Sequence, residues 1–270
     1  MTDALPAVLL AVAAAAYARR ARTLAARGRP VSRRRLACFA AGLAVVAVAL
    51  YSPLDALGEE RLFSAHMLQH LLLGDAAPLL LVLGLDGRLL RPLLALPVVG
   101  RLRLLAHPLV ALPLWAANFC AWHLPGAFDA ALRHDAVHDV QHGLFVLFGI
   151  LLWSALFEPL PGPAWFSAWW KLPYVAAMWL VMLVLSQVFI WSGHAWYEPY
   201  LHAPRTWGLS ALADQRAGGG VMLVESALTM LGTLVWLLLR VFAESEARQR
   251  LLDAGVDARA AARAARYGRV

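Results

Sequence analysis

Long apolar stretches alternate with short polar segments along the whole chain. The seven apolar stretches are 4–18, 36–51, 62–84, 104–122, 139–157, 173–193 and 218–241. A helix needs about 20 mostly apolar residues to cross the hydrocarbon core of a bilayer, and each stretch reaches or approaches that length. The pattern therefore predicts an all-α fold, a polytopic membrane bundle of seven transmembrane helices.

The composition favours the same class of protein. Hydrophobic residues make up 61% of the 270 residues and charged residues 15%, against about 45–50% and about 25% in soluble proteins. The mean hydropathy is +0.63. The two cysteines, Cys38 and Cys120, exclude a disulfide scaffold. The net charge of +7 could by itself indicate nucleic-acid binding. In a membrane protein this positive charge is better explained by arginines that orient the helices. We therefore expect the protein to interact with a lipid bilayer and not with nucleic acid.

The distribution of basic residues predicts the orientation of the bundle. With the N-terminus outside, the inner segments 19–35, 85–103, 158–172 and 240–270 carry 20 of the 24 basic residues. The positive-inside rule then places the C-terminus in the cytoplasm. We expect a transmembrane domain over 1–241 and a cytoplasmic basic tail over 242–270, with the glycine triplet 218–220 in a connecting loop.

Histidines gather toward the predicted outer face in a pattern that indicates a metal site. His66 and His70 are four residues apart near the outer end of the third stretch, and His138 and His142 repeat this spacing at the start of the fifth. Residues four apart share one helix face, so each pair can offer two imidazoles to one ion. We predict metal ligands from this set, with the last two less central to it: His66, His70, His138, His142, His194 and His123.

The sequence leaves the identity of the metal open. Imidazoles suit zinc, copper, iron or nickel, and the soft side chains of Met67 and Cys120 would favour copper. Met67 points about 100° away from His66 on a helix and is expected to pack, and Cys120 is expected to be a small buried residue. Asp75 and Glu225 lie inside predicted spans, where either a proton role or an interhelical hydrogen bond would account for them.

Several short motifs, in the same order along the chain, are similar to one known family. They are Tyr51-Ser-Pro-Leu-Asp55, His66-Met-Leu-Gln-His70, Trp122-His-Leu-Pro-Gly-Ala-Phe-Asp129, Val137-His-Asp-Val-Gln-His142, Gly193-His194 and Asp214-Gln215. Together they resemble the CtaG family of cytochrome c oxidase assembly factors over roughly residues 50–240. The resemblance implies a multi-pass protein of the bacterial plasma (inner) membrane, needed to make active oxidase and commonly linked to its copper supply. The chain has no Cys-x-x-x-Cys pair, so histidines would have to handle the copper.

Three functions follow as hypotheses. The first is an assembly factor, not an enzyme, that holds copper at the histidines and serves an oxidase subunit in the same membrane. The second is a membrane zinc hydrolase, with three histidines on zinc and Asp135 or Asp139 as the base. The third is a haem-binding electron carrier that uses one histidine from each of two helices.

Overall fold

The computed structural model describes residues 4–96 and 103–267, and over these ranges it is helical, without strands. The long helices are α1 (Ala4–Ala26), α2 (Arg33–Tyr51), α8 (Pro108–Trp122), α10 (Asp135–Phe157), α11 (Ala168–Trp191) and α13 (Ala211–Asp253). The helices α4 (Phe63–Leu71) and α5 (Ala77–Leu83) follow each other in one long rod. Shorter helices connect them: α3 (Pro53–Glu60), α6 (Gly87–Leu94), α9 (Pro125–Arg133), α12 (Glu198–His202) and α14 (Ala258–Tyr267). A π-helical turn, η1 (Leu72–Ala76), joins α4 to α5, and a 3₁₀ turn, η2 (Arg103–Ala106), precedes α8.

Among the described residues, six helices are long and apolar enough to cross a membrane, so this is a multi-pass membrane protein. They are α1, α2, the continuous rod α4–η1–α5, α10, α11 and α13. The fourth predicted stretch, 104–122, is different because α8 has only 15 residues. It begins at Pro108, whose missing N–H suits the first turn of a helix, after the 3₁₀ turn. A count of seven spans and their orientation therefore stay predictions.

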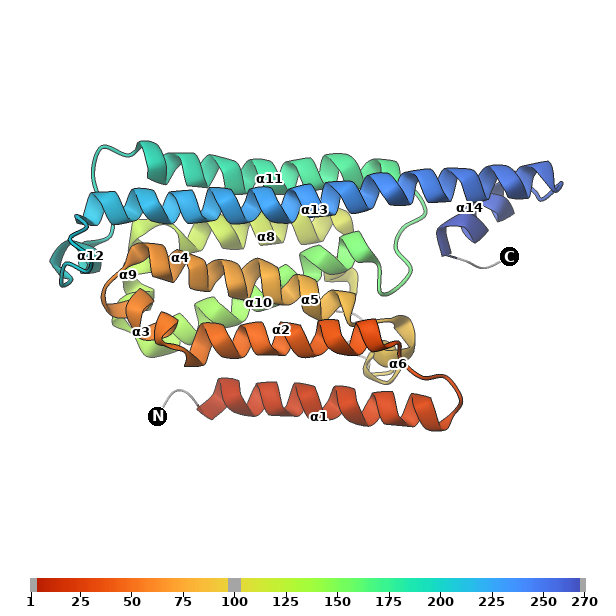
Figure 1. Cartoon of the computed structure of the whole chain (residues 1–270), viewed down its shortest axis with the longest axis horizontal. Helices are drawn as coiled ribbons and strands as arrows, with labels where there is room; N and C mark the ends of the chain where they lie inside the picture. Colours follow the sequence, from red (N-terminus) through yellow and green to blue (C-terminus); the bar gives the residue numbers. More distant parts are fainter. Residues whose placement is uncertain (1–3, 97–102, 268–270) are drawn as a thin grey trace.

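The long helices lie side by side, and short helices gather at the two ends of the bundle (Figure 1). The start of α1 lies at the same end as α3, α9 and α12, which we call the α9 end. Helices α6 and α14 lie at the opposite end, which we call the α14 end. The rod α4–η1–α5 lies inside the bundle, in contact with α2, α10 and α13. The rod therefore faces other helices on several sides.

Aromatic side chains fill the core at the α9 end. The ring of Phe63 at the start of α4 lies 5.1 Å from that of Phe189 on α11, and the Phe128 ring stacks on Tyr197 at 4.0 Å. All four side chains are almost completely buried. Large rings of this kind bury much apolar surface and pack at defined angles. They make the surroundings of the first turn of α4 rigid.

The π-helical turn η1 follows from a proline. Pro78 has no N–H to donate to the carbonyl of Gly74, one turn earlier. The helix widens here, and the N–H of Ala77 bonds to the carbonyl of Leu72, five residues back. Gly149 of α10 lies against this widened turn, because a Cβ there would be 2.3 Å from the Gly74 oxygen.

The polar residues predicted inside spans meet at this turn. Asp75 accepts a hydrogen bond from Nε1 of Trp153 on α10 at 2.8 Å and contacts Glu225 on α13. Glu225 also accepts a bond from Thr229 at 3.1 Å. Asp75 thus connects three helices, which is the structural alternative considered for it above.

The prediction of a glycine loop at 218–220 is wrong, because α13 runs unbroken from Ala211 to Asp253. A Cβ at Gly218 would lie 2.5 Å from Cδ1 of Phe63, and one at Gly219 would lie 2.8 Å from the Ser186 carbonyl oxygen. These glycines let α13 approach α4 and α11 closely, and they do not form a turn. The proposed boundary after residue 241 falls within the same helix.

Candidate metal centre

The two histidine pairs of the sequence face each other at the α9 end. His66 and His70 lie on α4, and His138 and His142 lie on α10. The four side chains are buried, and the structure brings one ligand atom from each within 4.8 Å of all the others. The i, i+4 spacing accounts for each pair, and the packing of α10 against the rod brings the pairs together. Metal binding by the group stays a prediction.

The buried ring nitrogens have few partners within the protein. Nε2 of His66 and Nε2 of His70 are 2.7 Å apart. Among the described residues, no hydrogen-bond partner reaches Nδ1 of His66, Nδ1 of His70, Nε2 of His138 or Nε2 of His142. Leaving a buried polar group unsatisfied costs about 1–3 kcal/mol. A cation bound by one nitrogen of each ring would give these buried rings a partner, so the group fits a metal ion.

The donor set restricts the metal. Bonds from imidazole to a zinc-sized ion are about 2.0–2.1 Å long, which places tetrahedral ligands roughly 3.4 Å apart. Small side-chain rotations would bring nitrogens that already lie within 4.8 Å to that separation. Four neutral nitrogen donors suit copper, zinc and other borderline transition ions, and not calcium or magnesium.

Glu59 on α3 orients one of the histidines. Its Oε1 lies 2.8 Å from Nδ1 of His138, which leaves Nε2 of that ring free to bind an ion. Helix α3 reaches this position because Gly58 lies against α4, where a Cβ would be 3.0 Å from Cα of His66. Sequence reasoning missed Glu59, since no spacing along the chain relates it to His138.

His123 and His194 have different positions relative to the group. His123 is buried with its ring 5.8 Å from that of His70, and its Nδ1 donates to the Phe119 carbonyl at 2.7 Å. It is a fifth imidazole beside the four. His194 is exposed beyond the end of α11 and lies outside the group, so the structure does not bring it to the other predicted ligands. Its carbonyl accepts a bond from Gln215 at 3.1 Å, which holds that segment on α13.

Asp214 on α13 fixes the start of the helix that carries His66. Its carboxylate accepts hydrogen bonds from the backbone N–H of Phe63 at 2.6 Å and of Ser64 at 3.2 Å. Leu62, which precedes α4, provides no side-chain cap of its own. A carboxylate at a helix N-terminus also interacts favourably with the helix dipole. The sequence offered Asp214 only as part of a motif, and its role comes from tertiary contact.

The remaining candidates do not join the group. Met67 is buried in the apolar core, as predicted. Cys120 was expected to be buried, but it is exposed on α8. Neither Asp135 nor Asp139 is among the described residues that could share an ion with the four histidines.

Comparisons with known proteins agree with the resemblance of the motifs. A family model described as cytochrome c oxidase caa3 assembly factor matches residues 15–244. Two uncharacterized proteins, one from Mycobacterium bovis and one from Mycobacterium tuberculosis, are each 27% identical to the chain over 212 residues. The match covers 69% of this chain and 31% of each relative, so the chain spans about a third of their length. No solved structure matches.

Proposed function

Because this chain belongs to the cytochrome c oxidase caa3 assembly factor family, we propose that it holds copper at the histidine group and supplies it to an oxidase subunit. The receiving subunit would lie in the same membrane, the bacterial plasma membrane. Copper is cargo here, not a resident cofactor. The observation that carries the proposal is the group of four buried imidazoles from α4 and α10, with ligand atoms within 4.8 Å of one another.

The chemistry of the group supports copper as the cargo. Nitrogen sites bind divalent copper more tightly than divalent zinc, following the usual order of the first transition series. His66, His70, His138 and His142 would hold the ion, and Glu59 would keep the His138 ring in position. Four histidines would also fill a tetrahedral shell, whereas a hydrolytic zinc site keeps one position open for water.

The position of the group also supports delivery. It lies at the α9 end, close to the short helices α3 and α9 and away from the basic α14 end. Nε2 of His123 is buried without a partner among the described residues, beside His70. It offers a neighbouring nitrogen through which the ion can change ligands on its way out. Exchange of this kind requires ligands that release the metal, which neutral imidazoles do more readily than thiolates.

The first test measures the metal in the purified full chain. The wild type, the double variant His70→Ala/His142→Ala and the control His134→Ala/His202→Ala are loaded with copper, desalted and subjected to elemental analysis. Both control histidines lie outside the group and are exposed. We expect the wild type and the control to keep copper near one ion per chain and the double variant to lose it.

Other results would overturn the proposal. Equal copper in all three proteins would place the ion elsewhere. Tightly bound zinc that copper does not displace would favour the hydrolase. A Soret absorption band that disappears in the double variant would favour a haem-binding electron carrier.

The second test asks whether the copper reaches an oxidase. Strains that lack the protein receive the wild type, the double variant or the control, and cytochrome c oxidase activity is measured in their membranes. We expect the double variant to fail at low copper and to recover when copper is added to the medium. Full activity with a variant that binds no copper would refute supply by this site.

A further inference from the structure

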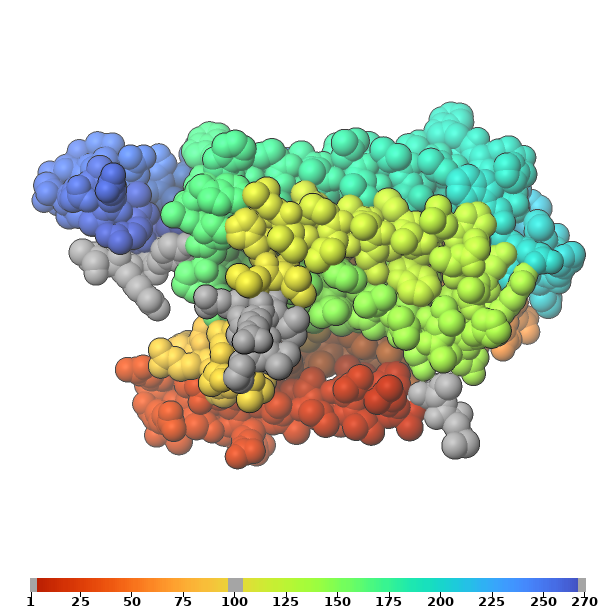
Figure 2. Space-filling model, turned by 180° about the vertical axis from the view of Figure 1, so that it is seen from behind, coloured from red at the N-terminus to blue at the C-terminus, as the bar shows by residue number. Residues whose placement is uncertain are grey.

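A cleft lies at the α14 end, far from the histidines. It has a volume of about 1250 Å³ and is bounded by α1, α6, α14 and the 158–161 segment. Figure 2 shows the molecule hollowed at this end, between α14 and the helices α1 and α6. The charged side chains that line it are six arginines and two acids: Arg20, Arg27, Arg29, Arg88, Arg91, Arg263, Asp86 and Glu158. The lining is strongly basic.

Both acids of the cleft already have cationic partners. Asp86 pairs with Arg88 at 2.8 Å. Burial alone would raise the pKa of Asp86, but the hydrogen bond from Arg88 and the N–H of Leu89 hold it below its usual value. Glu158 pairs with Lys171 at 2.9 Å and also with Arg266. The two acids therefore do not neutralise the other arginines.

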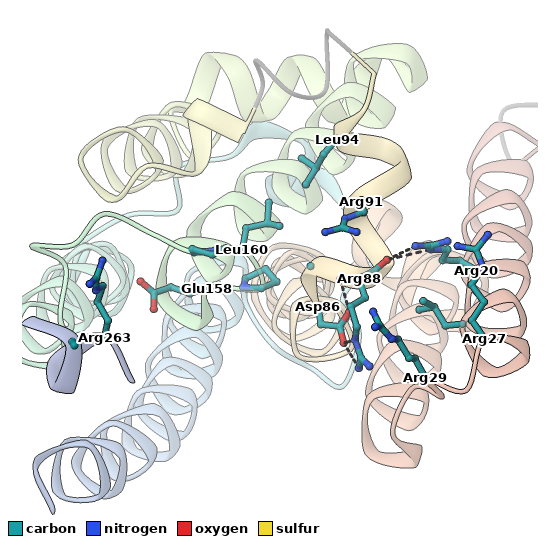
Figure 3. Close-up of a pocket in the computed structure, with 15 residues that line it drawn as sticks. Arg20, Arg27, Arg29, Asp86, Arg88, Arg91, Leu94, Glu158, Leu160 and Arg263 are labelled. Atoms are coloured by element: carbon teal, nitrogen blue, oxygen red, sulfur yellow. Dashed lines mark hydrogen bonds and ion pairs between the residues drawn. The ribbon is translucent and has the colours of Figure 1, made fainter. Parts of the chain in front are cut away.

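Four guanidinium groups remain available to a ligand. Within 4–96 and 103–267 no ion pair involves Arg27, Arg29, Arg91 or Arg263. They come from separate parts of the fold: the α1–α2 connection, α6 and α14. Figure 3 shows Arg91 and Arg88 on α6 between Arg27 and Arg29 on one side and Arg263 on the other. Positive charges that come from distant segments and outnumber the acids of the same cleft indicate an anionic ligand.

The far wall of the cleft is fixed in place. Arg266 of α14 binds the carboxylate of Glu158 and donates to the Ala164 carbonyl at 3.1 Å. Lys171 at the start of α11 holds the same carboxylate from inside the bundle. These contacts attach α14 to the 158–161 segment. The position of Arg263 is therefore defined by the folded protein and does not depend on a free tail.

The location of the cleft indicates that the anionic ligand is a membrane lipid. It lies where α1, α5 and α10 end. The exposed apolar surface of α1 lies farther along that helix, at Val12 and Leu9, about 12–17 Å from Arg20 at 1.5 Å per residue. Leu24, Leu94 and Leu160 line the cleft next to the arginines. Basic pockets between helices at the cytoplasmic ends of spans bind anionic lipid headgroups, and guanidinium groups bind phosphate oxygens in pairs. We propose that this cleft binds the phosphate headgroup of an anionic phospholipid, with its acyl chains along the apolar surface of α1.

Native mass spectrometry of the full chain in detergent tests the proposal. The protein is titrated with phosphatidylglycerol and with phosphatidylcholine of the same acyl chains. The variant Arg91→Gln/Arg263→Gln removes two cleft arginines. The control Arg248→Gln/Arg259→Gln removes two exposed arginines that do not line the cleft. We expect wild type and control to prefer phosphatidylglycerol, and the cleft variant to bind it about tenfold or more weakly.

A third titration with inorganic phosphate and pyrophosphate separates a lipid from a free anion. Weak binding of both salts supports the lipid assignment. If they bind with the same dependence on Arg91 and Arg263 while phosphatidylglycerol does not bind, the cleft takes a free phosphate and the lipid assignment is overturned. Equal losses in the cleft variant and the control would mean that general surface charge attracts the lipid, which also overturns it.

Discussion

Replacing Asp214 with asparagine should weaken metal binding at a group of histidines that Asp214 does not touch. The carboxylate caps α4 through the N–H groups of Phe63 and Ser64. His66 follows one turn later. Asparagine keeps one acceptor oxygen, but it removes the charge and points an amide toward backbone donors. The first turn of α4 should therefore loosen, and His66 should lose its fixed position.

The contacts define the size of the effect. Loss of an N-terminal cap costs about 0.5–2 kcal/mol, and hydrogen bonds to charged groups contribute about 1.5–3 kcal/mol. A value near 2 kcal/mol is a reasonable centre for this buried carboxylate. If metal binding must restore the ordered turn, the same free energy is lost from binding. At 1.36 kcal/mol per factor of ten, the affinity should fall by roughly 30-fold.

The assay is a competition titration of copper against a chelator, with circular dichroism to follow the folded state. A matched control is Asp257→Asn, because Asp257 caps α14 in the same way, accepting from the N–H groups of Arg259 at 3.0 Å and Ala260 at 3.1 Å. We expect both variants to remain folded and only Asp214→Asn to lose copper affinity. Equal affinities in the two variants would refute the reasoning that this cap positions His66.

Two further substitutions test individual contacts. Glu59→Gln weakens the bond that orients His138 and should lower copper affinity about 10- to 100-fold in the same titration. The control Glu60→Gln changes the exposed neighbouring residue and should not lower the affinity. Equal copper affinities in the two variants would contradict a positioning role for Glu59. Gly218→Ala places a Cβ 2.5 Å from an aromatic ring of α4 and should lower thermal stability by about 1–3 kcal/mol. Gly220→Ala has nothing within 4 Å of the new Cβ and should be neutral or stabilising, so the same loss in both would show that close packing is not the cause.

The sequence predicted those parts of the site that depend on local periodicity. The i, i+4 spacing within each helix correctly predicted that His66 and His70 share one face of α4. It predicted the same for His138 and His142 on α10. The closeness of the pairs is a property of the packing of α10 against the rod α4–η1–α5. It could be expected from their similar depth in the predicted bundle, but it could not be derived from the sequence.

What the sequence could not provide comes from contacts between distant segments. Glu59 meets His138 because α3 folds back on α4, and Asp214 meets Phe63 from 151 residues away. The glycines at 218–220 were interpreted as a loop because glycine usually interrupts helices. Here the small size of Gly218 and Gly219 is needed for tight packing, which outweighs their low helix propensity. His194 was placed with the other histidines from its position at a helix end, but its backbone is held elsewhere by Gln215.

Because α13 is so long, another protein in the membrane can approach the two ends of this protein to different extents. Its 43 residues extend about 64 Å at 1.5 Å per residue, whereas a bilayer with its headgroups is about 40–45 Å thick. The part from Ala211 to Arg240 is sufficient to cross that thickness, so the remainder projects about 20 Å past it at the α14 end. At the α9 end the described residues form short helices and loops (Figure 1). A large complex in the same membrane can therefore approach the α9 end closely. At the α14 end, the part of α13 after Arg240 keeps such a complex at a distance.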